Sequence, residues 1–316
     1  MLLKVFKCKC LINHEYYALK EIPKFKLIED KEILCHLNEP HILKKLVNYD
    51  FLPKLISSFQ DIENLYLVTN LNEGLTLYHY KDENMTEEQL KFISACIIQS
   101  FIYLRKNNII HRDIRMHNLI LDRDNYINLL DFSYAINYSQ RNEIKYYIRG
   151  EYFDNAPEIQ NFLVYDYNSD YYRLGGSILF YFIFKKYLNK IKIEKKVNEI
   201  IIEDKNIPNF TPSCIDFINK LIITDSKKRI GFKSIYELKN HSWFNNFDWQ
   251  KLSKKKIKSP LKFKKYNYNE SFCTKFDFSI NDKKFYKNKT KEELFKNLID
   301  KYDYVNYQLI NNTLNF

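Results

Sequence analysis

The segment HRDIRMHN, from His111 to Asn118, places charged and amide side chains between two short apolar runs. Apolar flanks indicate a buried position, where a charged group is costly unless it has a partner or a chemical role. Asp113 is the carboxylate of this segment, and Asn118 is its amide. We therefore take the segment as the first candidate for the chemistry of the protein.

Three further motifs flank this segment in the chain. YALK ends at Lys20, DFS spans 131–133 and APE spans 156–158. Together with HRDIRMHN they match, in order, the strand lysine, catalytic loop, metal-binding and APE motifs of protein kinases. Each motif alone is a weak signal, but the ordered set is specific. The chain therefore resembles the protein-kinase family over nearly its whole length.

The resemblance implies a role for each polar residue of the set. Phosphoryl transfer depends mainly on positioning and on neutralising charge. By resemblance, Asp113 accepts the proton of the substrate hydroxyl, and Arg115 steadies the γ-phosphate of ATP. Asn118 and Asp131 match the two groups that hold Mg²⁺, a cation that prefers oxygen ligands. Lys20 matches the lysine that contacts the α- and β-phosphates.

The resemblance also implies a helical glutamate as the partner of Lys20. Glu39, within HLNEPHIL, matches this position, and Glu32 is the alternative. Pro40 follows Glu39 directly, and proline disfavours helical geometry in the residue before it. We therefore expect the helix across 24–47 to be interrupted at Pro40.

The adenine base of the nucleotide is expected between apolar side chains. Val5, Ala18 and Ile120 match the positions above and below the adenine ring in kinases. Thr69 matches the gatekeeper position at the back of that pocket. The hinge that follows is expected to contribute Asn70 and Asn72.

Alternating and helical patterns predict the elements that position these residues. Strands are expected within 3–22 and in the segment KLISSFQDIENLYLVTNL, and a helix is expected over 86–107 with Thr86 near its start. An apolar core helix is expected in DYYRLGGSILFYFIFKKYL, and an amphipathic helix after Thr211. The fold class is α+β, with a small antiparallel β-sheet lobe and a mainly helical lobe. The expected divisions are 1–72, 73–249 and a tail over 250–316.

Other segments resemble the AGC group, which includes cyclic-nucleotide-dependent kinases and protein kinase C. Phe276 resembles the tail aromatic that covers the nucleotide, and 299–306 resembles the terminal hydrophobic motif that docks on the strand-rich half. Asp170 resembles the helix aspartate that braces the catalytic loop. Glu158 and Arg229 resemble a buried ion pair of the helical half.

The chain also departs from the family pattern. Counting back from Lys20, the glycine-rich phosphate loop would end near Leu3, so this loop and the first strand are expected to be missing. Ser133 replaces the glycine of DFG and restricts the backbone there. Glu151 replaces a threonine that helps to hold the catalytic aspartate, and Tyr147 stands at the activation-segment phosphosite. Two interpretations remain open: an active serine/threonine kinase, or a pseudokinase that serves as a binding or scaffold protein.

The net charge and its distribution limit the classes of partner that we expect. The net charge is +11, and 251–265 holds eight lysines without an acid. This run predicts a solvated surface, with contacts to anionic membranes or acidic proteins as the alternative. No aromatic stacking pattern accompanies it, so specific nucleic-acid binding is not expected. Basic-motif kinases of the AGC group carry acids where this chain has Thr76 and His117, so we expect a protein substrate that is not arginine-rich.

Composition and cysteine usage complete the expectations. The 316 residues are 45% hydrophobic, which is typical of a folded protein. No apolar run approaches the ~20 residues of a membrane span, and Lys4 and Lys7 interrupt the N-terminal apolar stretch that a signal peptide needs. Six scattered cysteines predict reduced thiols rather than a metal site. We expect a cytoplasmic protein, with attachment to a cytoskeletal or membrane structure left open.

Overall fold

The computed structural model describes residues 4–11, 13–29, 33–47, 49–61, 63–140, 155–162, 165–184, 209–262 and 304–305. The strands are β1 (Lys4–Lys9), β2 (Tyr16–Pro23), β3 (Leu55–Gln60), β4 (Asn64–Asn70), β5 (Leu75–Thr76), β6 (Ile109–Ile110), β7 (Leu119–Leu121), β8 (Ile127–Leu129), β9 (Ile136–Asn137) and β10 (Tyr304–Val305). The α-helices are α1 (Lys24–Glu29), α2 (Ile33–Lys45), α3 (Glu87–Lys106), α4 (Pro157–Phe162), α5 (Tyr167–Arg173), α6 (Tyr181–Phe184), α7 (Pro212–Leu221), α8 (Tyr236–Lys239) and α9 (Trp249–Ser253). Short 3₁₀ helices occur at Leu77–Tyr80, Met116–Asn118, Tyr138–Gln140 and Ser242–Phe244, and a π-helical segment spans Leu174–Phe180.

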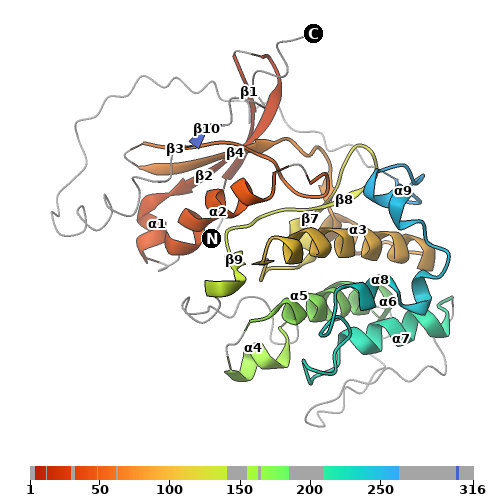
Figure 1. Ribbon diagram of the computed structural model, residues 1–316. Helices are drawn as coiled ribbons and strands as arrows, with labels where there is room; N and C mark the ends of the chain where they lie inside the picture. The colour runs from red at the N-terminus through yellow and green to blue at the C-terminus, as the bar shows by residue number, and fades with distance from the viewer. Residues whose placement is uncertain are drawn as a thin grey trace.

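An antiparallel sheet with the strand order β1-β2-β4-β3-β10 forms the upper half of the molecule in Figure 1. Helices α1 and α2 lie against this sheet, and α3 and α5–α8 form the helical half below it (Figure 1). The outermost strand β10 pairs Tyr304 with Ser58 and Val305 with Ser57. Part of the 299–306 motif therefore docks on the strand-rich half as expected, while its other residues lie outside the described residues.

Period-two alternation in β2 separates a core face from a face that carries the site. Tyr17 and Leu19 are buried in a cluster with residues of β3 and β4. Ala18 and Lys20 lie on the opposite face, because successive side chains of a strand point to opposite sides. The polar face of β2 is thus available for the ion pairs described below.

Helix α2 runs from Ile33 to Lys45 and contains Pro40 in its interior. The expected interruption at Pro40 was therefore wrong. Proline removes one backbone hydrogen bond and strains a helix, but packing can outweigh this cost. Ile42 and Leu43 after the proline are almost fully buried, and the Glu39 side chain before it is held by contacts from two other elements.

Side-chain caps start the main helices of the lower half where the sequence predicted them. The Thr86 hydroxyl accepts a hydrogen bond from the Gln89 backbone N–H, and the Gln89 side chain accepts one from the Thr86 N–H, which makes a capping box before α3. Thr211 caps α7 in front of Pro212 at its first turn. The buried face of α3 then packs into one large apolar core with residues of both halves.

The expected core helix after Asp170 is present, but its geometry changes along its length. The seven residues Leu174–Phe180 form a π-helical segment between α5 and α6. At Gly175, an added Cβ would lie 2.7 Å from the Cβ of Leu221, so α7 approaches the backbone too closely for a side chain there. A π-helical turn is wider than an α-helical one, and such segments are frequent at functional sites.

The segment after α9 is fastened to the β7–β8 hairpin. Lys255 Nζ lies 2.7 Å from Asp122 Oδ2, and the Tyr126 hydroxyl donates to the Ile257 carbonyl at 2.6 Å. Lys255 is thus structural, whereas the other described lysines of the basic run are exposed: Lys251, Lys254, Lys256, Lys258 and Lys262.

Two further expectations can be compared with the described part of the chain. Cys8, Cys10, Cys96 and Cys214 are free thiols, as the reduced state predicts. Within the residues that the structure describes, no helix is both long enough and apolar enough to cross a membrane.

Candidate active site

Lys20 joins the two halves of the molecule through a pair of carboxylates. Its Nζ lies 2.9 Å from Glu39 Oε2 on α2 and 2.8 Å from Asp131 Oδ1, which follows β8. The second oxygen of Glu39 accepts the Phe132 backbone N–H at 3.0 Å. The structure therefore pairs Lys20 with Glu39; the alternative, Glu32, lies outside the described residues.

Opposing effects set the charges of this cluster. Burial alone disfavours the charged forms, but the Lys20 ammonium and hydrogen bonds from Lys20 and Ser133 hold the pKa of Asp131 well below its usual range. Burial likewise opposes charge on Lys20, yet Asp131 and Glu39 raise its pKa above the normal value. Burial and the nearby Asp131 raise the pKa of Glu39. Lys20 and Asp131 are thus a charged pair in the folded protein.

The β7–β8 hairpin places Asn118 beside Asp131. Asn118 precedes β7 and Asp131 follows β8, and the antiparallel register pairs Leu119 with Leu129. The Leu130 N–H donates to the Asn118 carbonyl at 2.7 Å, so the two segments are directly bonded. Asn118 and Asp131 therefore lie at the same end of the β7–β8 hairpin.

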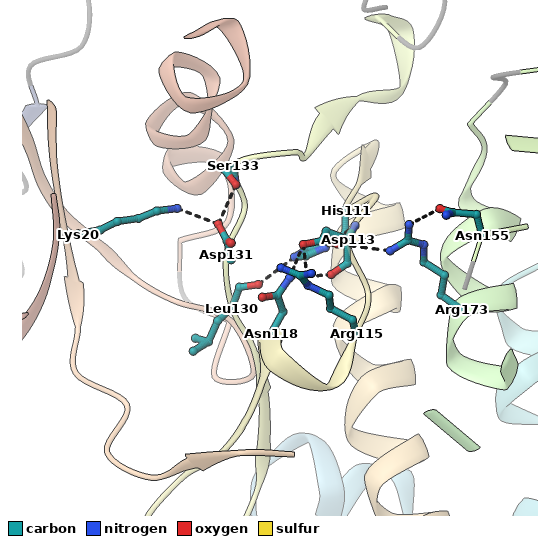
Figure 2. Close-up of polar contacts among 10 residues, drawn as sticks. All are labelled: Lys20, His111, Asp113, Arg115, Asn118, Leu130, Asp131, Ser133, Asn155 and Arg173. Atoms are coloured by element: carbon teal, nitrogen blue, oxygen red, sulfur yellow. Dashed lines mark hydrogen bonds and ion pairs between the residues drawn. The ribbon is translucent and has the colours of Figure 1, made fainter. Parts of the chain in front are cut away.

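Asp113 lies at the centre of a set of polar contacts and is only 2% exposed. Its Oδ2 oxygen accepts a hydrogen bond from Asn118 Nδ2 at 2.7 Å and lies 3.2 Å from Arg115 Nε. Its Oδ1 oxygen lies 3.3 Å from Arg173 Nη1 (Figure 2). Because the Arg115 side chain is 39% exposed, it forms the outer cover of this carboxylate.

The backbone around Asp113 is held from within the helical half. Asp170 on α5 accepts the N–H groups of His111 and Arg112 at 2.8 and 2.9 Å, which is the bracing contact expected from the resemblance. Burial lowers the pKa of His111 to about 4, so its ring is neutral at pH 7. Its Nδ1 accepts the Asp113 N–H, which leaves Nε2 to donate to the Leu130 carbonyl (Figure 2).

The residues expected around the adenine lie on facing surfaces of the two halves. Strand register puts Val5 opposite Lys20, and Thr69 opposite Ala18, so these four side chains share one face of the sheet. Val5 is 60% exposed. Ile120 lies on β7 below and is buried.

The two hinge asparagines contact each other through their side chains. Asn70 accepts the Lys54 backbone N–H at 2.6 Å through its side chain, and its Nδ2 lies 3.3 Å from Asn72 Oδ1. These contacts tie the hinge to the chain just before β3.

The donor types at this centre fit a magnesium ion that binds together with phosphates. The Lys20 cluster contains two carboxylates and one ammonium. The amide nitrogen of Asn118 donates to Asp113, so the amide oxygen is the group of Asn118 that would bind a cation. The Ser133 hydroxyl, in place of the family glycine, donates to Asp131 Oδ1 at 2.8 Å. No group of three or more His, Cys, Asp or Glu ligands converges within the described ranges. The remaining ligands of a cation would therefore come from phosphate.

Arg173 and Asn155 were missed in the sequence. Arg173 was treated only as part of an apolar helix, although a charged residue amid apolar neighbours is itself a signal of a buried partner. The contact with Asp113 spans 60 positions of the chain. The local sequence can therefore indicate that Arg173 has a buried partner, but not that this partner is Asp113.

The positions linked to substrate choice and regulation are placed only in part. His117 stacks on Tyr78 at a ring distance of 4.0 Å, and the Thr76 hydroxyl lies 3.0 Å from His79 Nδ1. The Glu158–Arg229 ion pair is present, with a shortest distance of 2.6 Å. The other expectations fall outside the described residues: Tyr147, Glu151 and Phe276.

Comparison with known proteins agrees with this arrangement. The model of the protein kinase domain matches residues 3–244. A probable serine/threonine-protein kinase of Dictyostelium discoideum is 31% identical over 82% of this chain and 57% of its own length. The cAMP-dependent protein kinase catalytic subunit of Schizosaccharomyces pombe is 32% identical over 78% of this chain and 49% of its own length.

Sgk1 of Xenopus tropicalis is 29% identical over 82% of this chain and 63% of its own length. The chain thus spans about half to three fifths of the length of these curated relatives. The similarity to the cAMP-dependent kinase and to Sgk1 supports the AGC-like resemblance, and the antiparallel sheet above a helical half is the two-lobed α+β arrangement. The chain belongs to the protein kinase domain family.

Proposed function

We propose that this chain is a protein serine/threonine kinase that uses ATP and Mg²⁺. The observation that carries the proposal is the junction at Lys20, whose Nζ lies 2.9 Å from Glu39 Oε2 and 2.8 Å from Asp131 Oδ1 across the two halves. This junction also adjoins the loop that holds Asp113. The family to which the chain belongs generally uses this chemistry.

In this proposal, the residues act mainly by positioning charge. Lys20, fixed by Glu39, would bind the α- and β-phosphates of ATP, and Asn118 and Asp131 would hold Mg²⁺, which neutralises phosphate charge. Asp113 would orient the substrate hydroxyl and accept its proton. Because Arg115 covers Asp113 Oδ2, its side chain would have to swing toward the γ-phosphate as substrate enters.

We further propose a protein substrate that is not arginine-rich. By resemblance, Thr76 and His117 would lie beside the substrate residues that precede the phosphorylated serine or threonine. Neither position carries an acid. Lys81 lies nearby, with its Nζ 2.9 Å from the Tyr78 hydroxyl and 4.3 Å from the Tyr78 ring centre. A guanidinium would find no carboxylate at these two positions, whereas an acidic or neutral side chain would meet no repulsion there.

We also propose that the basic run after α9 contacts anionic partners and that the protein is cytoplasmic. The exposed lysines Lys251, Lys254, Lys256 and Lys258 could meet an acidic protein or an anionic membrane surface. A cytoplasmic location goes with the use of ATP.

The test is phosphate transfer by the purified full chain with labelled ATP, Mg²⁺ and matched peptide pools. The pools carry either arginine or glutamate before a serine or threonine. Transfer is expected in the wild type, with a loss of about 100-fold or more in Lys20→Met and in Asp131→Ala. Lys54→Met is the matched control, because the half-buried Lys54 pairs through its side chain with the surface residue Asp50, away from the Lys20 junction. It should retain wild-type transfer.

Two results would count against the proposal. Equal transfer in wild type and Asp131→Ala would show that a contaminating enzyme transfers the phosphate. No transfer, together with no Mg²⁺-dependent thermal stabilisation by ATP, would favour the scaffold alternative. Preference for the arginine pool would contradict the substrate proposal alone.

A further inference from the structure

One contact of Asp113 comes from a residue outside all of the motifs. Arg173 is the last residue of α5 and is 3% exposed. Its Nη1 lies 3.3 Å from Asp113 Oδ1, and its Nη2 donates to Asn155 Oδ1. Figure 2 shows the guanidinium between Asp113 and Asn155, on the side of the loop that faces the helical half.

The burial of Arg173 makes this contact energetically important. A guanidinium remains charged in a protein interior, so it needs an anion and good hydrogen-bond geometry to be tolerated. Asp113 supplies the anion, and Asn155 fixes the second arm of the planar fork. Breaking such a buried pair from either side leaves an uncompensated charge.

The Asp113 carboxylate is thereby held between two guanidinium groups of different character. Arg115, on the loop itself, approaches Oδ2 from the exposed side, while Arg173 approaches Oδ1 from the interior. A swing of Arg115 toward a phosphate would remove the outer cation. The inner one would stay in place because its side chain is enclosed.

We propose that Arg173 is a positioning residue of the catalytic loop. It fixes the rotation of the Asp113 carboxylate from the interior and so presents Oδ2 to the substrate side. The kinetic consequence rests on the proposed kinase function. The charge contact itself does not.

Among the described residues, Arg115 and the neutral His111 face Asp113 from its own loop, and Arg173 faces it from α5. Asp170 on α5 binds the loop backbone, so the backbone stays braced when Arg173 is changed. Without Arg173, Oδ1 of Asp113 loses its partner on α5, so the carboxylate should no longer be held in one orientation.

The test that does not require activity is the ¹³C NMR spectrum of the aspartate carboxyls in the full chain at pH 7. The Asp113 resonance is assigned with Asp113→Asn. Arg173→Met should shift the Asp113 carboxyl resonance, and Arg173→Lys should shift it less, because an ammonium keeps the charge but cannot hold both partners. Arg105→Gln is the matched control.

Arg105 on α3 contacts Tyr171 of α5 and the Gly231 carbonyl, so its loss disturbs packing beside Arg173 without touching Asp113. The control should leave the Asp113 resonance unchanged. An unchanged Asp113 resonance in Arg173→Met would overturn the inference. If Arg173→Met does not fold, Arg173→Lys and Asn155→Ala are measured instead, and a wild-type Asp113 resonance in both would overturn it.

Kinetics separate this inference from the proposed function. If the wild type transfers phosphate, Arg173→Met should lower kcat about 10- to 100-fold, with the KM for ATP unchanged. If the wild type shows no transfer, the kinase proposal fails, while the carboxyl NMR spectra still decide whether Arg173 holds Asp113.

Discussion

Asp170 offers the sharpest test of how the candidate site is held, because one carboxylate binds two consecutive backbone groups. Its oxygens accept the His111 and Arg112 N–H groups at 2.8 and 2.9 Å, and all three residues are buried. Asp170→Ala would leave two buried donors without these acceptors. Each unsatisfied donor costs about 1–3 kcal/mol, so for the two donors together we expect a loss of roughly 2–6 kcal/mol.

Two further variants provide a scale for the expected loss in the free energy of unfolding. Asp170→Asn keeps one acceptor oxygen and should lose about half as much. Asp166→Ala removes an acid of the same helix that caps the Tyr167 N–H at its start, so a loss of about 1 kcal/mol is expected.

The measurement is the free energy of unfolding in urea, together with amide hydrogen exchange at His111 and Arg112. Exchange at these two amides should accelerate in Asp170→Ala and stay slow in Asp166→Ala. The reasoning is refuted if the alanine variant at 170 loses no more stability than the one at 166. Unchanged protection of the two amides would refute it equally.

Three further predictions concern the same lobe. Burial raises the pKa of Asp170 from 3.8 to about 6, so the unfolded chain loses this proton first as pH rises, and the group's contribution to stability should fall by roughly 2.4 kcal/mol between pH 4 and pH 7. Urea midpoints of wild type and Asp170→Asn at both pH values check this, and a constant difference would contradict it. Glu158→Ala strands a fully buried arginine and should cost about 3–5 kcal/mol in urea unfolding, whereas loss of the exposed ion pair in Lys228→Ala should cost less than about 1. Gly231→Ala forces a side chain to φ +93° with its Cβ 2.7 Å from the Tyr171 ring, and a thermal midpoint within 1 °C of wild type would disprove this strain.

Much of the fold follows from local patterns in the sequence. Alternation predicts the strands that carry Ala18 and Lys20, and hydroxyl caps predict the starts of α3 and α7 at Thr86 and Thr211. These signals work because capping and alternation are satisfied within a few residues of chain. The contact of Lys20 with Asp131 spans 111 positions and was reached through the family resemblance rather than through local pattern.

Other features depend on packing that no local pattern encodes. Pro40 predicts a break, yet α2 continues because Glu39 and the apolar residues after the proline are held by other elements. The π-helical segment arises where α7 presses on Gly175. The Arg173 contact needs the catalytic loop and α5 already assembled.

Strand β10 has a consequence for self-association. It covers the outer side of β3 at Ser57 and Ser58, and an uncovered sheet margin is a template on which another molecule can add a strand. A chain shortened before Tyr304 would leave the backbone groups of β3 open to such recruitment. The pairing of β10 therefore closes this part of the sheet edge to a strand from another molecule.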